Sequence, residues 1–161
     1  MTPEAGRAFA HVPSSRSVSD IPWYADGLAF ACTRCGNCCT GAPGSVRVSE
    51  AECEELAALV GLDLADFCER FTRLLEDGTV SLIERTNGDC IFWSASAGCL
   101  VYAARPRQCR TWPFWRRNLA SPEAWREAAA GCPGIGRGTP HSLAEIERAH
   151  ADDGTRGLPM E

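Results

Sequence analysis

Four cysteines fall within eight residues of this chain, at Cys32, Cys35, Cys38 and Cys39. Two residues between a pair of thiols let the backbone fold around one ion, and amides in such a turn can hydrogen-bond the sulfurs. A cluster this dense has no explanation as core packing, and without a partner it would be prone to oxidation. Because the segment 32–44 is also rich in glycine and proline, we expect an irregular metal-binding loop there rather than a helix.

The chain has ten cysteines in all, and the remaining six divide into two sets. Cys53 and Cys68 lie on the apolar faces of two predicted helices, where a free thiol behaves as a small apolar side chain. The others lie outside any helical pattern and are expected to complete the ligand set: Cys90, Cys99, Cys109 and Cys132. These thiolates together suit two four-thiolate sites, or one polynuclear site with spare or bridging ligands.

The predicted donor set contains sulfur only. The histidines, which are His11, His141 and His150, are expected to be surface residues away from the cysteines. An all-sulfur site favours iron–sulfur or zinc over magnesium, calcium or manganese. The remote Cys132-Pro133 pair is similar to the Cys-Pro that completes a ferredoxin cluster, which favours an iron–sulfur cluster or iron, with zinc as the alternative.

The adjacent pair Cys38 and Cys39 carries an expectation of its own. Neighbouring side chains of an extended segment point to opposite sides. We therefore expect the two thiolates to serve different metals, or one of them to bridge two ions.

A disulfide framework of the kind found in secreted proteins is the main alternative to metal binding. Residues 1–19 lack the apolar core of a secretory signal, and no apolar run approaches the length of a membrane span. We therefore expect a reducing cytoplasmic location, no membrane association, and metal or redox chemistry rather than disulfides.

Charge restricts the classes of partner. The formal net charge of −5 argues against a polycation that coats nucleic acid. All 16 basic residues are arginine, which excludes mechanisms that need a lysine, such as a Schiff base or a P-loop.

One segment, between Asp89 and Glu123, has no acidic residue and interleaves arginines with aromatic residues. One role for this segment is to bind an anionic substrate or nucleic acid. The other, which we favour, is to stabilise nearby thiolates, with Arg105 and Arg110 beside Cys109. The arginines of the segment are Arg105, Arg107, Arg110, Arg116 and Arg117.

The 161 residues suffice for one compact domain. We expect a small α+β fold with irregular cysteine-rich loops, a helical hairpin and a short antiparallel sheet. Residues 1–20 lack periodicity, so we expect a disordered arm there. We expect residues 21–150 to form the metal-binding domain and residues 151–161 to form a flexible tail.

The helical hairpin is predicted from capping signals. Ser49 followed by Glu52 forms a capping-box pattern, so a helix is predicted from there to Gly61. Asp63 caps a second helix that is predicted to extend to about Asp77-Gly78.

Other elements are predicted from alternation and turn signals. Residues 46–48 and 80–84 are expected to be strands, and the Asn87-Gly88 turn predicts residues 90–93 as the antiparallel partner of the strand at 80–84. Two further helices are expected towards the C-terminus, over 121–131 and 140–150.

The sequence resembles the YkgJ-type cysteine-cluster family, also described as the CxxCxxCC or zinc- or iron-chelating domain. Four motifs carry the resemblance, FACTRCGNCC at 30–39, DCIFW at 89–93, GCLVYAARPRQCRTWPF at 98–114 and CPGIGRG at 132–138. The resemblance spans roughly 22–138 and implies a small cytoplasmic bacterial domain that binds iron or zinc through the eight cysteines named above. Cys53 and Cys68 match none of the motifs, and the resemblance implies no established reaction.

The expected function is metal binding, by an iron–sulfur cluster or zinc held by up to eight thiolates. Three roles fit it: electron transfer with a redox partner, a structural zinc domain that binds another protein, or delivery of metal to a recipient protein. The preference for iron–sulfur makes an oxidoreductase the first hypothesis. No catalytic residue is assigned, and Tyr102 and Asp89 are expected to be structural.

Overall fold

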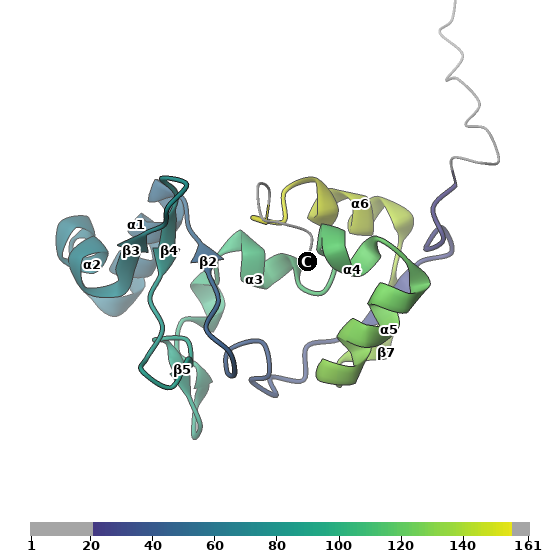
Figure 1. Cartoon of the computed structure of the whole chain (residues 1–161), viewed down its shortest axis with the longest axis horizontal. Coiled ribbons are helices and arrows are strands. Elements are labelled where there is room, and N and C mark those ends of the chain that lie inside the picture. Colours follow the sequence, from purple (N-terminus) through teal and green to yellow (C-terminus); the bar gives the residue numbers. More distant parts are fainter. Residues whose placement is uncertain (1–20, 156–161) are drawn as a thin grey trace, which may run out of the picture.

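The computed structural model describes residues 21–155, so the predicted arm at 1–20 lies outside the described residues. Figure 1 shows two groups of elements, one at each end of the long axis, with a bridge of helix and loop between them. We call residues 46–85 the hairpin lobe, and residues 112–151 with the strand they pair with the C-terminal lobe. The expected α+β fold with short antiparallel sheets is confirmed.

The two helices of the hairpin lobe begin where their capping signals predict. α1 (Glu50–Val60) starts with the capping box of Ser49 and Glu52 and ends at Gly61, which adopts the left-handed conformation. α2 (Leu64–Phe71) follows after Asp63, whose side chain accepts a hydrogen bond from the N–H of Asp66. The predicted helical hairpin is therefore confirmed.

The predicted extension of the second helix to residue 78 is wrong. α2 ends at Phe71, and the chain continues as β3 (Thr72–Leu74), antiparallel to β4 (Val80–Leu82). Thr72 adopts extended backbone while its hydroxyl donates to the carbonyl of Cys68, and this ends the helix. Leu74, which the pattern placed on the apolar face of the helix, is 72% exposed.

The sheet of this lobe has the strand order β2–β4–β3, with β2 (Val46–Arg47) antiparallel to β4. The prediction that residues 90–93 pair with the strand at 80–84 holds only at the end of that strand, because β2 and β3 occupy both edges of β4. Residues beyond the Asn87-Gly88 turn make one isolated bridge, from Cys90 to Glu84. They then enter a separate hairpin of β5 (Trp93–Ser94) and β6 (Gly98–Cys99).

In the C-terminal lobe, α4 (Arg116–Leu119) precedes α5 (Pro122–Gly131), which has the predicted start at Ser121 and the predicted end. The final helix begins later than expected. β7 (Ile135–His141) contains Pro140 and pairs with β1 (Leu28–Phe30), and α6 (Leu143–Ala151) starts only after Ser142 caps it.

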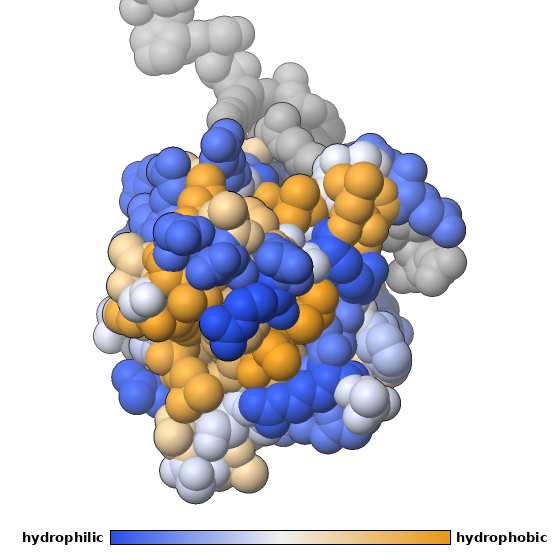
Figure 2. Space-filling model, turned by 90° about the vertical axis from the view of Figure 1, so that its left-hand side faces the viewer, coloured by the Kyte–Doolittle hydropathy of each residue, from blue (hydrophilic) through white to orange (hydrophobic). Residues whose placement is uncertain are grey.

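Each lobe has an apolar core of its own. Leu56 and Phe67 are fully buried in the hairpin lobe, where Phe92 stacks on Phe67 with ring centres 6.1 Å apart. Phe114 and Trp125 stack at 5.8 Å in the core of the C-terminal lobe. Figure 2 views the molecule from the side of the hairpin lobe, where apolar and charged residues intermingle over the surface. The exposed large apolar residues of this lobe are Leu59, Val60 and Leu74.

A short bridge joins the lobes. α3 (Arg107–Thr111) lies between them (Figure 1), preceded by η2 (Tyr102–Ala104). The carbonyl of Asp153, a residue with 2% of its surface exposed, accepts a hydrogen bond from the hydroxyl of Thr111 of α3. Asp153 accepts a hydrogen bond from the N–H of Arg116 at 3.0 Å, so the chain is packed beyond residue 151, where a flexible tail was expected to begin. Residues 156–161 lie outside the described part. No helix in the described part is long and apolar enough to span a membrane.

Candidate metal centre

Residues 31–44, which we call the cysteine loop, contain no helix or strand, as the sequence predicts. The loop is held at both ends by backbone groups next to other cysteines. The N–H of Ala31 donates to the carbonyl of Gly134 at 3.1 Å, and the side chain of Asn37 donates to the carbonyl of Gly131 at 3.0 Å. At the other end the N–H of Cys90 donates to the carbonyl of Cys39 at 2.8 Å. Hydrogen bonds therefore attach the loop at one end to residues near Cys132 and at the other end to Cys90.

A tight turn within the loop sets the direction of its thiols. The N–H of Cys39 donates to the carbonyl of Gly36 at 2.7 Å, and the hydroxyl of Thr40 donates to the same carbonyl. Gly36 has a φ of +82°, and a Cβ there would lie 2.1 Å from the ring of Trp93. Only glycine satisfies both conditions, so this residue lets the turn rest on the β5–β6 hairpin.

The turn also brings the thiols of the adjacent cysteines close together. The Sγ atoms of Cys38 and Cys39 lie 3.8 Å apart. The prediction assumed extended backbone, whereas Asn37–Cys39 form a turn, in which successive side chains no longer alternate. Two sulfurs about 2.3 Å from one tetrahedral ion are about 3.8 Å apart, so this spacing matches two ligands of a single ion.

One cavity of about 740 Å³ brings the predicted ligands together. Its lining includes all eight cysteines of the predicted set, Cys32, Cys35, Cys38, Cys39, Cys90, Cys99, Cys109 and Cys132. Cys53 and Cys68 do not line it and instead belong to the apolar core of the hairpin lobe. We call this space the cysteine cavity.

The thiols share the cavity without a tight ligand set. Within residues 21–155, no three His, Cys, Asp or Glu side chains are close enough to hold one ion together. Cys32, Cys35 and Cys38 are exposed, whereas Cys132 is buried and its sulfur accepts a hydrogen bond from the indole N–H of Trp112 at 3.4 Å. The donors present are soft sulfurs, which fit zinc or iron and not magnesium or calcium.

The pKa values of several cavity cysteines are shifted by burial and by neighbouring thiols. A hydrogen bond from the thiol of Cys39, together with the charge of Arg105, lowers the pKa of Cys38 to about 7. The same hydrogen bond raises the pKa of Cys39, because the pair shares a proton, and burial and the neighbouring Cys90 raise it further. Burial raises the pKa of Cys109 to about 12, and nearby thiols add to the effect. The sulfurs of Cys38, Cys90, Cys99 and Cys109 therefore lie within electrostatic reach of one another.

Arg105 is the arginine that the structure places beside the thiols. Its charge acts to lower the pKa values of Cys38, Cys99 and Cys109, as the sequence interpretation expected of it. The same expectation for Arg110 is wrong. The guanidinium of Arg110 donates to the carbonyl of Arg105 and lies 3.8 Å from Glu52, so it turns away from Cys109 towards a carboxylate of α1.

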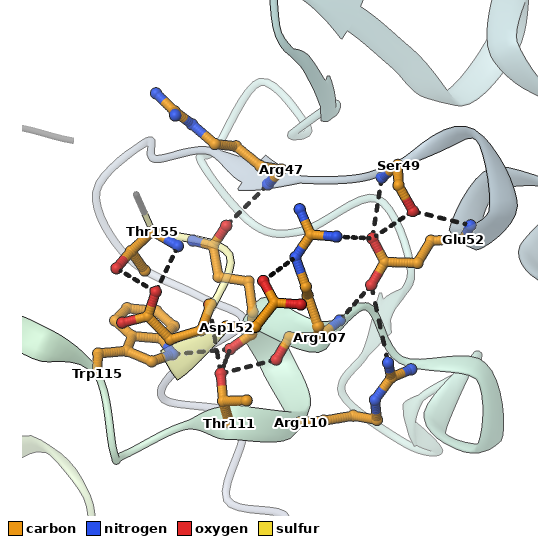
Figure 3. A network of polar contacts seen from close by, with 11 residues as sticks. Arg47, Ser49, Glu52, Arg107, Arg110, Thr111, Trp115, Asp152 and Thr155 are labelled. Carbon is orange, nitrogen blue, oxygen red and sulfur yellow. Dashed lines mark hydrogen bonds and ion pairs between the residues drawn. The ribbon is translucent and has the colours of Figure 1, made fainter. Parts of the chain in front are cut away.

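Glu52 is a positioning residue that sequence reasoning did not identify beyond its role as a helix cap. Figure 3 shows its carboxylate between the start of α1 and α3, where it accepts hydrogen bonds from the N–H groups of Ser49 and Arg107. It also forms ion pairs with the side chains of Arg107 and Arg110. Burial alone would raise the pKa of Glu52, but these donors hold it below its ordinary value. The carboxylate thus fixes the helix that carries Cys109.

Gln108 provides a second attachment of this helix. Its side chain is buried, accepts from the N–H of Arg47 at 2.8 Å, and donates to the carbonyl of Ser45 at 2.8 Å. Its own carbonyl accepts from the indole of Trp115 at 2.8 Å. A glutamine next to a cysteine gives no sequence signal for such contacts, because the partners are more than 60 residues away in the chain.

The comparisons with known proteins agree with this picture of the site. A family model described as "CxxCxxCC: Putative zinc- or iron-chelating domain" matches residues 31–133, which include all the cysteines of the cavity. Uncharacterized protein MJ0661 of Methanocaldococcus jannaschii is 28% identical over 92 residues, or 56% of this chain and 48% of that protein. The chain thus spans about half the length of this curated relative. No solved structure matches the chain.

Proposed function

The chain belongs to the CxxCxxCC family of zinc- or iron-chelating domains, and we propose that it holds iron as a thiolate-ligated iron–sulfur centre in the cysteine cavity. The proposed ligands are drawn from the eight cysteines that line the cavity. Such a centre would serve redox or electron transfer with a protein partner. Neither His141 nor His150 lines the cavity, so its sulfur donors would hold the centre without a histidine of the described residues.

The observation that carries the proposal is the division of the cysteines. All eight that belong to the family motifs line one cavity, although they come from segments about 100 residues apart in the chain. The two that match no motif lie in an apolar core. One tetrahedral ion uses four thiolates, so eight in one cavity favour a polynuclear centre or two neighbouring ions.

Exposure of part of the ligand set supports a role in exchange with a partner. Cys32, Cys35 and Cys38 are open to solvent, while Cys109 and Cys132 lie on the inner side. Ligands at the surface leave a centre in the cavity within reach of a partner protein.

The second candidate is a zinc domain that delivers its metal or binds a protein. The 3.8 Å spacing of the Cys38 and Cys39 sulfurs favours it, since this is the spacing of two ligands on one zinc ion.

One preparation distinguishes the two candidates. The protein is purified without oxygen, and its iron, zinc and inorganic sulfide are counted beside its visible spectrum. Iron with sulfide and a charge-transfer band in the visible is the expected result. Colourless protein with stoichiometric zinc would select the second candidate, because zinc is d¹⁰. Folded, freshly made protein with neither metal would overturn both.

A further inference from the structure

The cysteine cavity is larger than a metal centre needs. Its volume of about 740 Å³ lies in the range of pockets that hold small organic molecules, which is roughly 300–1,000 Å³. Aromatic side chains from two segments contribute to its wall, namely Trp93 of β5 and the pair Trp112 and Trp115 between α3 and α4. The cavity therefore has room and apolar surface for a ligand beside the thiols.

Two arginines are held against one tyrosine in this wall. The guanidinium carbon of Arg105 lies 3.6 Å from the ring centre of Tyr102, and that of Arg34 lies 4.1 Å from the same centre. All three residues line the cavity. Contact with the ring restricts both guanidinium groups and holds two like charges within about 8 Å of each other. The stack is an arrangement that an anion would stabilise.

These two arginines lack the carboxylate partners that their neighbours have. Arg107 pairs with Glu52 and Asp152, and Arg110 pairs with Glu52. Across residues 21–155, neither Arg34 nor Arg105 forms an ion pair with a carboxylate. Arg105 uses its Nε to donate to the carbonyl of Tyr102, which leaves the outer edge of its guanidinium open. Arg34 and Arg105 thus line the cavity without an ion pair to a carboxylate of residues 21–155.

We infer that the stack of Arg34, Tyr102 and Arg105 binds the carboxylate or phosphate group of a small molecule that enters the cysteine cavity. A planar guanidinium presents two parallel N–H donors, which match two oxygens of either group. The aromatic wall would contact the body of the ligand. The inference deepens the proposed function, because the ligand would share the cavity with the metal centre.

The test uses the full chain as purified, with its metal content measured in every sample. Inorganic phosphate and succinate are the two probes, each titrated at constant ionic strength against sodium chloride. Tryptophan fluorescence reports binding, because three tryptophans line the cavity. Wild type is expected to show a saturable change with phosphate, with succinate or with both, and none with chloride. The responding probe identifies the class of ligand.

Substitutions at Arg34 test the site itself. Arg34→Gln is expected to weaken binding by about tenfold or more at unchanged metal content, because one charge-assisted pair is lost. Arg34→Lys keeps the charge but removes the planar fork, so it should also weaken binding. Arg126→Gln is the matched control, since Arg126 is an exposed arginine outside the cavity that pairs with Glu123.

Three results would overturn the inference. The first is a wild type that shows no saturable response to either probe, and the second is equal binding by wild type and Arg34→Gln. The third is loss of metal in Arg34→Gln that Arg34→Lys restores, without any effect of the probes, because Arg34 would then only balance thiolate charge. Wild type that binds a probe but holds no metal would contradict the proposed function while leaving the arginine site intact.

Discussion

The hairpin lobe and the cysteine loop are neighbours in sequence but are stabilised in different ways. The lobe has capped helices, fully buried Leu56 and Phe67, and a sheet whose central strand is paired on both edges. In the loop, residues 31–44, Gly36 is buried and Cys39 half-buried, and the other side chains are exposed. A few backbone hydrogen bonds and the contact of Gly36 with Trp93 hold the loop in place.

This difference indicates which part of the molecule metal binding would stabilise. The lobe contributes most of the side chains of a buried apolar core, whereas the loop buries almost none. In loop-dominated sites the free energy of metal binding is also free energy of folding. We therefore expect metal to order the loop and the walls of the cavity while leaving the hairpin lobe largely unaffected.

The largest expected effect comes from removing a ligand on the inner side of the cavity. Cys109→Ser should weaken metal binding by at least about tenfold and lower the melting temperature, because an ion is left under-coordinated. Metal-to-protein ratio and thermal melting with and without chelator measure both effects.

Cys53→Ala is the matched control for that substitution. Cys53 is 3% exposed, and burial raises the pKa of its thiol to about 12, so it acts as an apolar core residue. Its loss should cost about 1 kcal/mol of unfolding free energy and no metal. Metal loss from Cys53→Ala, or full metal content in Cys109→Ser, would show that the division between core and ligand cysteines is wrong.

A smaller effect is expected where the lobe meets the cavity. Glu52→Gln removes a nearly buried carboxylate from two half-exposed arginines, and we expect a loss of about 2 kcal/mol of unfolding free energy in denaturant titrations. Glu123→Gln removes the partner of Arg126 in an exposed ion pair and should cause no measurable change. Equal stabilities of the two variants would argue that the lobe and α3 are not joined through Glu52.

The difference in stability between wild type and Glu52→Gln is expected to depend on pH. The pKa of Glu52 is lowered in the folded state, so the carboxylate contributes stability that is fully present above its ordinary value of 4.5. This contribution is lost as the pH falls below that value towards the folded pKa. The difference between wild type and Glu52→Gln should therefore be constant from pH 6 to 7, in denaturant titrations, and shrink below about pH 4.5. A difference that grows on acidification would contradict this assignment.

The sequence predicted features that depend on local chemistry. The caps at Ser49, Asp63 and Ser121 are set within a few residues, and each appears where the pattern placed it. The end of α2 is set by Thr72 and the short β3–β4 hairpin, which continued helical periodicity concealed, whereas β4 pairs with β2 across more than 30 positions of sequence. Local patterns carry no information about which distant segment occupies a sheet edge.

The candidate site divides in the same way. Spacing separated the cysteines that line the cavity from Cys53 and Cys68, because helical periodicity marks a core thiol. It did not reveal the turn that brings the sulfurs of Cys38 and Cys39 to 3.8 Å, nor the link from Glu52 to Arg110, which lies 58 positions further along the chain. The turn depends on contact between Gly36 and Trp93, and the ion pair depends on the packing of α3 beside α1.

Peptide-resolved amide hydrogen exchange, on metal-loaded and chelator-treated protein, tests the central claim most directly. Removal of metal should deprotect amides in residues 31–44 and 98–110, while those of α1 and α2 keep their protection within experimental error. Loss of protection in α1 and α2 to the same extent as in the cysteine loop, or no change in the loop, would contradict the account.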